Sequence, residues 1–200
     1  MDSKTTFDIS TLITTIDFAA KKHVKQRRKD SDATPYINHP IGVAKILVDA
    51  GVTDVATLQA AVLHDTVEDT NTTFEELEEY FGKEVEEIVK ECTDDKTLPV
   101  MERKRLQIET TPHKSVKAKL VKLADKLYNL KDIQRCVPVG WTVEYAQGYY
   151  TWAKKVTDGK HLVDSAKGVN DGLTSQLEEL YKSGTFEHRG MTYKCHPTYT

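Results

Sequence analysis

The segment HDTVED, residues 64–69, brings together residue types that hydrolases use to bind metals and to move protons. Its spacing predicts a helix in which His64 and Glu68 lie one turn apart, as do Asp65 and Asp69. The segment follows the apolar run AAVL, so this end of the helix is expected to enter the protein. Carboxylates gathered there would repel one another unless a cation neutralised them. A solvated acidic helix end is the alternative, because runs of charge are usually exposed.

Two further positions could complete a metal site. His39 lies in PYINHP, where two prolines restrict the backbone around one imidazole. Asp125 interrupts the apolar helical pattern of KLVKLADKLYNL, and a buried carboxylate needs a partner. With His64 and Asp65 they offer two imidazoles and two carboxylates from three separate segments. Nitrogen and oxygen ligands without a thiolate suit Mn²⁺, Fe²⁺ or Zn²⁺. The residues therefore favour a metal-dependent hydrolase.

Helices must position these groups, because apolar residues recur at helical spacing along nearly the whole chain. The stripe at positions 120, 123, 124, 127 and 130 predicts a buried helix with Asp125 on the neighbouring face. A similar stripe at positions 9, 12, 13, 16 and 20 predicts a first helix that packs on the core. No stretch alternates with a period of two. The expected fold is all-α, a single bundle of roughly 8–10 helices.

The helical pattern ends near residue 182. This predicts one domain over residues 1–182, followed by a tail or loosely docked extension over residues 183–200. His188, Cys195 and His196 lie in that tail at irregular spacing, which is more typical of incidental residues than of a metal site.

The composition excludes several classes of protein. The 200 residues are 38% hydrophobic and 30% charged, as in globular proteins. A net charge of −3 provides no basic field for nucleic acid, and no apolar run is long enough to span a membrane. The first residues lack the features of a secretory signal. Cys92, Cys136 and Cys195 are widely spaced and suggest free thiols in a reducing compartment. We therefore expect a cytoplasmic protein with neither a nucleic-acid nor a membrane partner.

Three longer strings carry a resemblance to a known family. RRKDSDATPYINHP, AAVLHDTVEDT and VKLADKLYNL occur in the order and spacing of the HD-domain hydrolases of the RelA/SpoT type, in which they are the metal and substrate motifs. The resemblance covers residues 8–182 and is most specific to the animal branch. It extends over the hydrolase part of the family alone and so implies hydrolase activity. The loop TDDKTLP differs from the bacterial form, and residues 183–200 have no counterpart.

The resemblance implies an Mn²⁺-dependent enzyme that removes the 3′-pyrophosphate of guanosine 3′,5′-bis(diphosphate) or the corresponding triphosphate, (p)ppGpp. It also implies removal of the 2′-phosphate of NADPH, as in the animal branch. The residues that match the family motifs fall into three groups: metal ligands His39, His64, Asp65 and Asp125; a catalytic acidic pair, Glu68 and Asp69; and substrate-binding residues Arg28, Lys29, Tyr36, Asn129 and Tyr149.

Two other functions remain open at this point. The chain could be another HD-type nucleotide phosphohydrolase, although such relatives need no RK…PYINHP loop. It could also be a non-catalytic nucleotide sensor, although a sensor gains nothing from a carboxylate pair beside the metal. For the substrate residues there are ordinary structural alternatives: a solvated basic loop for Arg28 and Lys29, and core packing for the two tyrosines.

Overall fold

The apolar periodicity produces helices, as predicted. The structure is a computed structural model that describes residues 3–158 and 169–197. In chain order the elements are α1 (Ser3–Lys22), α2 (Asn38–Asp49), α3 (Val55–Leu63), α4 (Thr66–Asp69), α5 (Phe74–Phe81), α6 (Lys83–Cys92), α7 (Val100–Thr110), the 3₁₀ turn η1 (Thr111–His113), α8 (Val116–Arg135), α9 (Val143–Thr157), α11 (Val169–Ser183), β1 (Thr185–His188) and β2 (Met191–Lys194). The all-α class is confirmed, with one short hairpin added.

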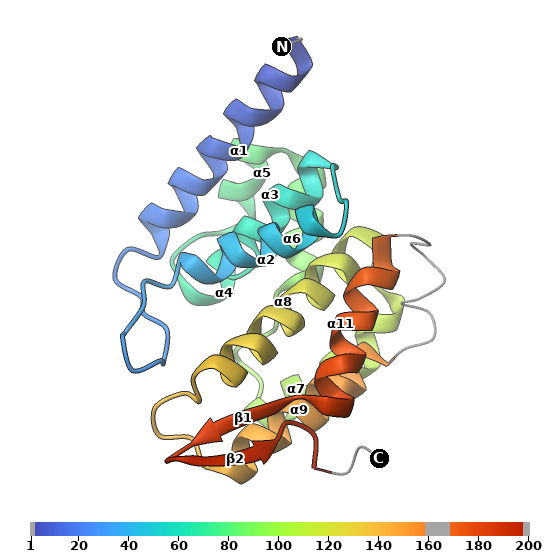
Figure 1. Cartoon of the computed structure of the whole chain (residues 1–200). Coiled ribbons are helices and arrows are strands. Elements are labelled where there is room, and N and C mark those ends of the chain that lie inside the picture. The colour runs from blue at the N-terminus through green and yellow to red at the C-terminus, as the bar shows by residue number, and fades with distance from the viewer. Residues whose placement is uncertain (1–2, 159–168, 198–200) are drawn as a thin grey trace.

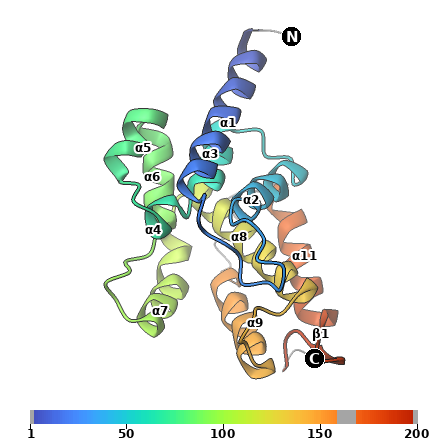
Figure 2. The same ribbon diagram turned by 90° about the vertical axis from the view of Figure 1, so that its left-hand side faces the viewer.

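Helix α8 is the central element of the fold. The Ser115 hydroxyl accepts a hydrogen bond from the Ala118 amide and so begins the helix. The predicted stripe is buried, with Leu127 and Leu130 fully inaccessible. Helices α2, α3, α6, α9 and α11 contact α8, and it crosses the middle of the molecule in both views (Figures 1 and 2). Because α8 is surrounded, even the residues beside its apolar stripe are removed from solvent.

The segment 64–69 is not the single continuous helix that we predicted. Helix α3 ends at Leu63, the chain turns, and the short α4 begins at Thr66. Two side chains take over carbonyls that the helix leaves without a partner: His64 Nδ1 donates to the Ala61 carbonyl at 2.8 Å, and the Thr66 hydroxyl donates to the Leu63 carbonyl at 2.7 Å. The turn directs His64 and Asp65 toward the same site as His39 and Asp125.

The apolar stripe predicted for the first helix is buried only in part, because Leu12 and Ile16 pack against the core and two other members do not. Ile9 and Ile13 are 48% and 61% exposed, whereas Thr15 and Ala19 are fully buried. Figure 1 shows the first turns of α1 extending beyond the other helices. The helix packs through its second half, where the Thr15 hydroxyl accepts a hydrogen bond from the buried Gln59 side chain of α3 at 3.0 Å.

The expectation of a loosely docked tail after residue 182 is also wrong for the described residues. Strands β1 and β2 pair antiparallel around Arg189 and Gly190, both of which have positive φ. Such a two-residue turn matches the twist of a hairpin. Phe186 of β1 is 2% exposed and stacks on Tyr150 of α9, with ring centroids 6.3 Å apart. The hairpin therefore closes the core beside α8 and α9. Residues 198–200 lie outside the described part.

Within the described residues, no helix combines the length and apolarity that crossing a membrane requires.

Candidate metal centre and nucleotide cleft

Three of the four predicted metal ligands lie within a few ångströms of one another. One ligand atom each from His39, His64 and Asp125 falls within 4.8 Å of the other two, and all three residues are buried. They come from α2, from the turn after α3, and from the middle of α8. The packing of these elements in the core thus brings together three side chains that lie far apart in the sequence.

Asp65, the fourth predicted ligand, lies beside this group. Its Oδ2 is 3.1 Å from His64 Nε2 and 3.4 Å from His39 Nε2. The same oxygen accepts a hydrogen bond from the Tyr36 hydroxyl at 2.6 Å. Tyr36 therefore holds Asp65 in place, a contact that the sequence did not indicate.

The donor atoms fit a divalent cation. Because a carbonyl oxygen can only accept, the bond from Nδ1 to Ala61 places a proton on His64 Nδ1 and leaves Nε2 facing the site. That nitrogen is buried, has no hydrogen-bond partner, and faces the carboxylates of Asp65 and Asp125 at 3.1 and 3.7 Å. A ring nitrogen opposite two carboxylates requires a positive charge between them, which either a proton on the nitrogen or a bound metal ion supplies. Two imidazoles with carboxylates form a ligand set typical of Mn²⁺, Fe²⁺ or Zn²⁺.

Buried charges around the cluster are paired with opposite charges. The Lys126 ammonium is 2.9 Å from Asp125 Oδ2 and is 4% exposed. Burial alone would raise the pKa of the Asp125 carboxyl, but the Lys126 charge and the contacts with His39 and His64 together outweigh it and hold that pKa well below its usual range. For His64, burial lowers the pKa, but Asp65 and Asp125 outweigh burial and raise it well above the ordinary value. Both shifts reflect a site that favours carboxylates beside a positive charge.

A cavity of about 240 Å³ opens over the cluster, and we call it the metal chamber. Glu68 and Asp69 line it together with the four predicted ligands. Burial, followed by the charges of Asp65 and Asp94, raises the pKa of Glu68 above its ordinary value. The structure thus brings the acidic pair to the same cavity as the ligands, although α3 and α4 are separate helices.

The loop between α6 and α7 contacts both members of the acidic pair. The Asp94 amide donates to Glu68 Oε2 at 3.3 Å, and Lys96 forms an ion pair with Asp69. Arg103 of α7 lies 3.7 Å from Glu68. The carboxylates are therefore oriented from the side opposite the metal ligands.

Sequence reasoning missed the basic residues of this chamber. Four cations line it: Arg103, Lys104, Lys122 and Lys126. Lys122 and Lys126 are 7% and 4% exposed, and they flank Asp125 on α8. Two lysines interrupting the same apolar helix as Asp125 were a usable signal, because lysine is almost never buried unless it is paired. Together these cations make the chamber a site for a polyanion.

A second cavity, of about 400 Å³, adjoins the first, and we call it the nucleoside chamber. The two share Tyr36, Asp69, Asn129 and Tyr149 in their walls. Arg28 and Lys29 line the second cavity only, with Trp141, a residue that the sequence did not indicate. All five predicted substrate residues therefore lie along one two-chambered cleft.

A chain of hydrogen bonds joins the two chambers. Arg28 Nη2 donates to Asp132 Oδ2 at 2.8 Å and to Asn129 Oδ1 at 2.9 Å. Asn129 Nδ2 in turn donates to Asp125 Oδ1 at 2.7 Å. The guanidinium of Arg28 also lies 5.6 Å from the ring of Tyr36. Asn129 is therefore fixed between the guanidinium and a predicted metal ligand, and one N–H and one oxygen lone pair remain for a substrate.

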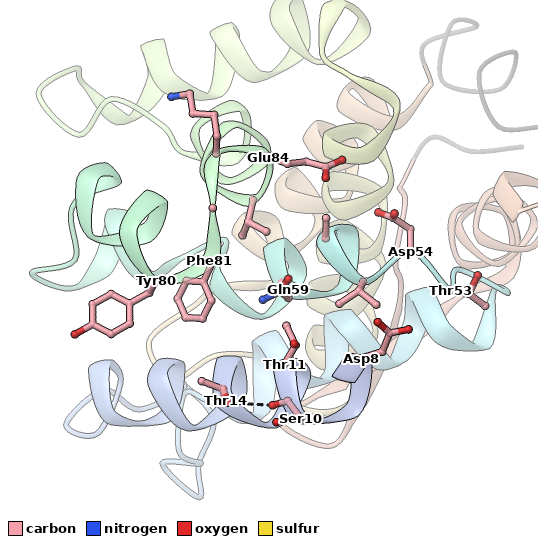
Figure 3. Close-up of a pocket in the computed structure, with 15 residues that line it drawn as sticks. Asp8, Ser10, Thr11, Thr14, Thr53, Asp54, Gln59, Tyr80, Phe81 and Glu84 are labelled. Carbon is pink, nitrogen blue, oxygen red and sulfur yellow. Dashed lines mark hydrogen bonds between the residues drawn. The ribbon is translucent and has the colours of Figure 1, made fainter. Parts of the chain in front are cut away.

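A cavity larger than either chamber, about 990 Å³, lies elsewhere. Figure 3 shows it between α1 and the segments that carry Asp54, Gln59 and Phe81. Hydroxyls of Ser10, Thr11 and Thr14 line it, and it contains no histidine. Size alone would therefore have selected the wrong site.

Comparison with known proteins agrees with this geometry. A family model described as "HD domain" matches residues 15–151. Guanosine-3′,5′-bis(diphosphate) 3′-pyrophosphohydrolase MESH1 of Xenopus tropicalis is 57% identical over 175 residues, which are 87% of this chain and 94% of that protein. The human protein of the same name is 56% identical over 182 residues, which are 90% of this chain and 96% of that protein.

A solved structure is also similar. It carries the description "A metazoan ortholog of SpoT hydrolyzes ppGpp and plays a role in starvation responses" and superposes with a TM-score of 0.78. It is 48% identical and covers 84% of this chain and 94% of its own. The family model covers the part of the chain that contains every predicted site residue. This chain therefore belongs to the HD-domain family, in the group of the metazoan SpoT homologues.

Proposed function

We propose that this protein is a metal-dependent hydrolase that removes the 3′-pyrophosphate from guanosine 3′,5′-bis(diphosphate). The observation that carries the proposal is the convergence of His39, His64 and Asp125 at the base of a cation-lined chamber that adjoins a nucleoside-sized cavity. The names of the relatives that match nine-tenths of the chain support the choice of substrate.

His39, His64, Asp65 and Asp125 would hold the metal, and Mn²⁺ is the ion that we propose. Such an ion supplies a Lewis acid that makes water nucleophilic near neutral pH and offsets the charge of the phosphate. Tyr36, Asn129 and Lys126 each bond to a ligand carboxylate, so they fix the orientation of Asp65 and Asp125.

Glu68 is the proposed general base. Its pKa is raised, so it can accept the proton of the attacking water near neutral pH. The water oxygen attacks the phosphorus attached to ribose O3′, the O3′–P bond breaks, and O3′ takes up a proton as it leaves. Asp69, held by Gln26 at 2.8 Å and by Lys96, would orient the water.

The cations of the metal chamber would bind the pyrophosphate. Lys122, Lys126 and Arg103 line the chamber from two sides, and charge that develops on phosphate oxygens is stabilised by preorganised cations. In the nucleoside chamber, Arg28 and Tyr149 provide flat surfaces for a purine, with Lys29 near the phosphates of its 5′ side.

The same cleft supports a second substrate, NADPH, whose adenosine carries a 2′-phosphate. Stacking on Arg28 does not require guanine, because every purine has a π face. Ribose C2′ and C3′ are adjacent, so a small shift of the sugar brings either phosphorus within the roughly 3–3.5 Å that attack requires. We also place the protein in the cytoplasm, which the free thiols of Cys92, Cys136 and Cys195 support.

The test is product release by the purified protein with and without Mn²⁺. We expect pyrophosphate from guanosine 3′,5′-bis(diphosphate) and orthophosphate from NADPH, with NADH as the second product. Each substrate should inhibit turnover of the other competitively, and Asp65→Ala should remove both activities together. Non-competitive inhibition, or loss of only one activity, would show two sites and contradict the proposal of a single cleft.

A further inference from the structure

A fourth cavity, of about 640 Å³, lies between α7 and α9. Its lining is mostly apolar and includes Met101 and Ile108 of α7 and Tyr145 of α9. Met101 and Tyr145 are 76% and 50% exposed, so the cavity opens to solvent as a groove along the two helices. We call it the α7–α9 groove.

The groove is continuous with the catalytic cleft. Lys104, Tyr149 and Trp152 line both the groove and the metal chamber, and Tyr149 also lines the nucleoside chamber. The Trp152 indole donates to the Lys104 carbonyl at 3.0 Å, which links α9 to α7 across this partition. A ligand that fills the cleft therefore reaches the groove by passing over a single layer of side chains.

Glycine at position 148 is unusual for the middle of a helix. Glycine destabilises a helix interior relative to alanine by roughly 0.5–1 kcal/mol. A Cβ added at Gly148 would meet no protein atom within 4 Å, so the fold itself does not require glycine there. Gly148 lines the groove, and its missing side chain keeps the α9 surface flat. A flat ligand that lies on this surface would explain why glycine occupies the position despite the loss of helix stability.

The charges of the groove complement an anionic ligand with an aromatic ring. The Lys104 ammonium lies 5.4, 5.7 and 5.0 Å from the ring centroids of Tyr145, Tyr149 and Trp152. Lys155 also lines the groove and has no ion-pair partner among the residues that the structure describes, whereas Glu144 adds one negative charge to the lining. Aromatic faces beside an ammonium group match a planar heterocycle joined to phosphates.

We infer that the α7–α9 groove binds the second, ring-bearing half of a dinucleotide substrate whose 2′-phosphorylated half occupies the cleft. The inference rests on the proposed NADPH phosphatase function. The ring lies on Tyr145 over Gly148, and the phosphates that join the two halves pass Lys104. Guanosine 3′,5′-bis(diphosphate) has no second ring and does not use the groove.

The test compares three substrates on protein variants that fill the groove without removing a cleft residue. Gly148→Leu projects a side chain into the groove, and Gly172→Leu is the matched control, because Gly172 in α11 also faces open space. The substrates are NADPH, adenosine 2′,5′-bisphosphate, which lacks the second half, and guanosine 3′,5′-bis(diphosphate). Equilibrium dissociation constants of the two 2′-phosphorylated ligands are measured alongside kcat and KM.

We expect Gly148→Leu to raise KM and Kd for NADPH by about tenfold or more, with kcat preserved. For the other two substrates, and for all three with Gly172→Leu, the values should stay within about twofold. Lys155→Glu tests the same site without altering a helix glycine and should weaken NADPH binding selectively.

Two outcomes would overturn the inference while leaving the proposed function intact: unchanged NADPH parameters in both groove variants, or equal losses for all three substrates. If the unaltered protein binds adenosine 2′,5′-bisphosphate and NADPH with equal affinity, the second half makes no contact and the inference fails. If the unaltered protein releases phosphate from neither ligand, the NADPH function itself is wrong and the groove assignment fails with it.

Discussion

The base of the cleft comes from α2, α8 and the turn after α3, whose side chains also fill the core, whereas the opposite wall is α7, in which no residue is buried. On the first side every ligand carboxylate is hydrogen-bonded, and the imidazoles are fixed by packing. On the second side the acidic pair is contacted by ion pairs from Lys96 and Arg103, whose side chains are 47% and 22% exposed. The comparison indicates a rigid metal side that sets the chemistry and a more exposed, adaptable wall whose contacts can rearrange.

Removing a ligand on the rigid side should have the largest effect. We expect Asp125→Ala to abolish turnover and to lower the metal content of the purified protein, because a ligand is lost and Lys126 is left buried without its partner. Metal per chain is measured by mass spectrometry. Asp132→Asn is the control on the same helix: it should keep its metal, because Asp132 bonds to Arg28 and not to the cluster. Normal Mn²⁺ content in Asp125→Ala would refute the ligand assignment.

Changing the proposed base should have the next largest effect. Glu68→Gln is expected to reduce kcat by about 10²- to 10⁴-fold while the metal remains bound. Only the deprotonated carboxylate acts as a base, so the raised pKa of Glu68 places the rise of kcat/KM with pH above the ordinary glutamate value of 4.5. That limb should disappear from the pH profile of the variant. A profile that is unchanged in Glu68→Gln would assign the base to another group.

A smaller effect is expected at the loop that carries Arg28. Asp30 accepts hydrogen bonds from the Thr34 hydroxyl and amide, which lower its pKa to about 2. A lowered pKa stabilises the fold at a pH above the unfolded value of 3.8, and the contribution is lost as the pH falls through 2. Asp30→Asn should therefore cost about 1–2 kcal/mol at neutral pH and little at pH 2. Equal losses at both pH values, in denaturant unfolding, would exclude this ionic contribution.

The adaptable wall should be the least sensitive in stability. Met101→Ala on α7 is expected to change the free energy of unfolding by less than about 0.5 kcal/mol, because the side chain is 76% exposed. Leu127→Ala on α8 is the comparison and should cost about 2–5 kcal/mol, since that side chain is fully buried. Similar losses in urea unfolding would mean that α7 is as integral to the core as α8.

The parts predicted correctly from the sequence depend on local patterns. The α8 stripe follows the helical period, and its residues are buried as predicted. Residue types and spacing pointed to the four metal ligands, the resemblance assigned the catalytic and substrate residues, and the structure brings all of them to one cleft.

The parts that were missed depend on tertiary contacts. The helix breaks after Leu63 because the side chains of His64 and Thr66 replace backbone hydrogen bonds. The spacing of apolar residues in the sequence carries no information about such side-chain bonds. The hairpin at residues 185–194 is stable because Phe186 reaches Tyr150, 36 positions earlier in the chain. Lys126 lies buried because Asp125 is ionised beside it, so its role follows only from the assembled site.

Metal removal tests the central claim most directly. The purified protein is treated with a chelator, and pyrophosphate release from guanosine 3′,5′-bis(diphosphate) is measured against bound Mn²⁺ as the ion is returned. The account predicts no release from the metal-free protein and full recovery at about one ion per chain, as one cluster of ligands requires. Release at the original rate from protein that contains no metal would contradict it.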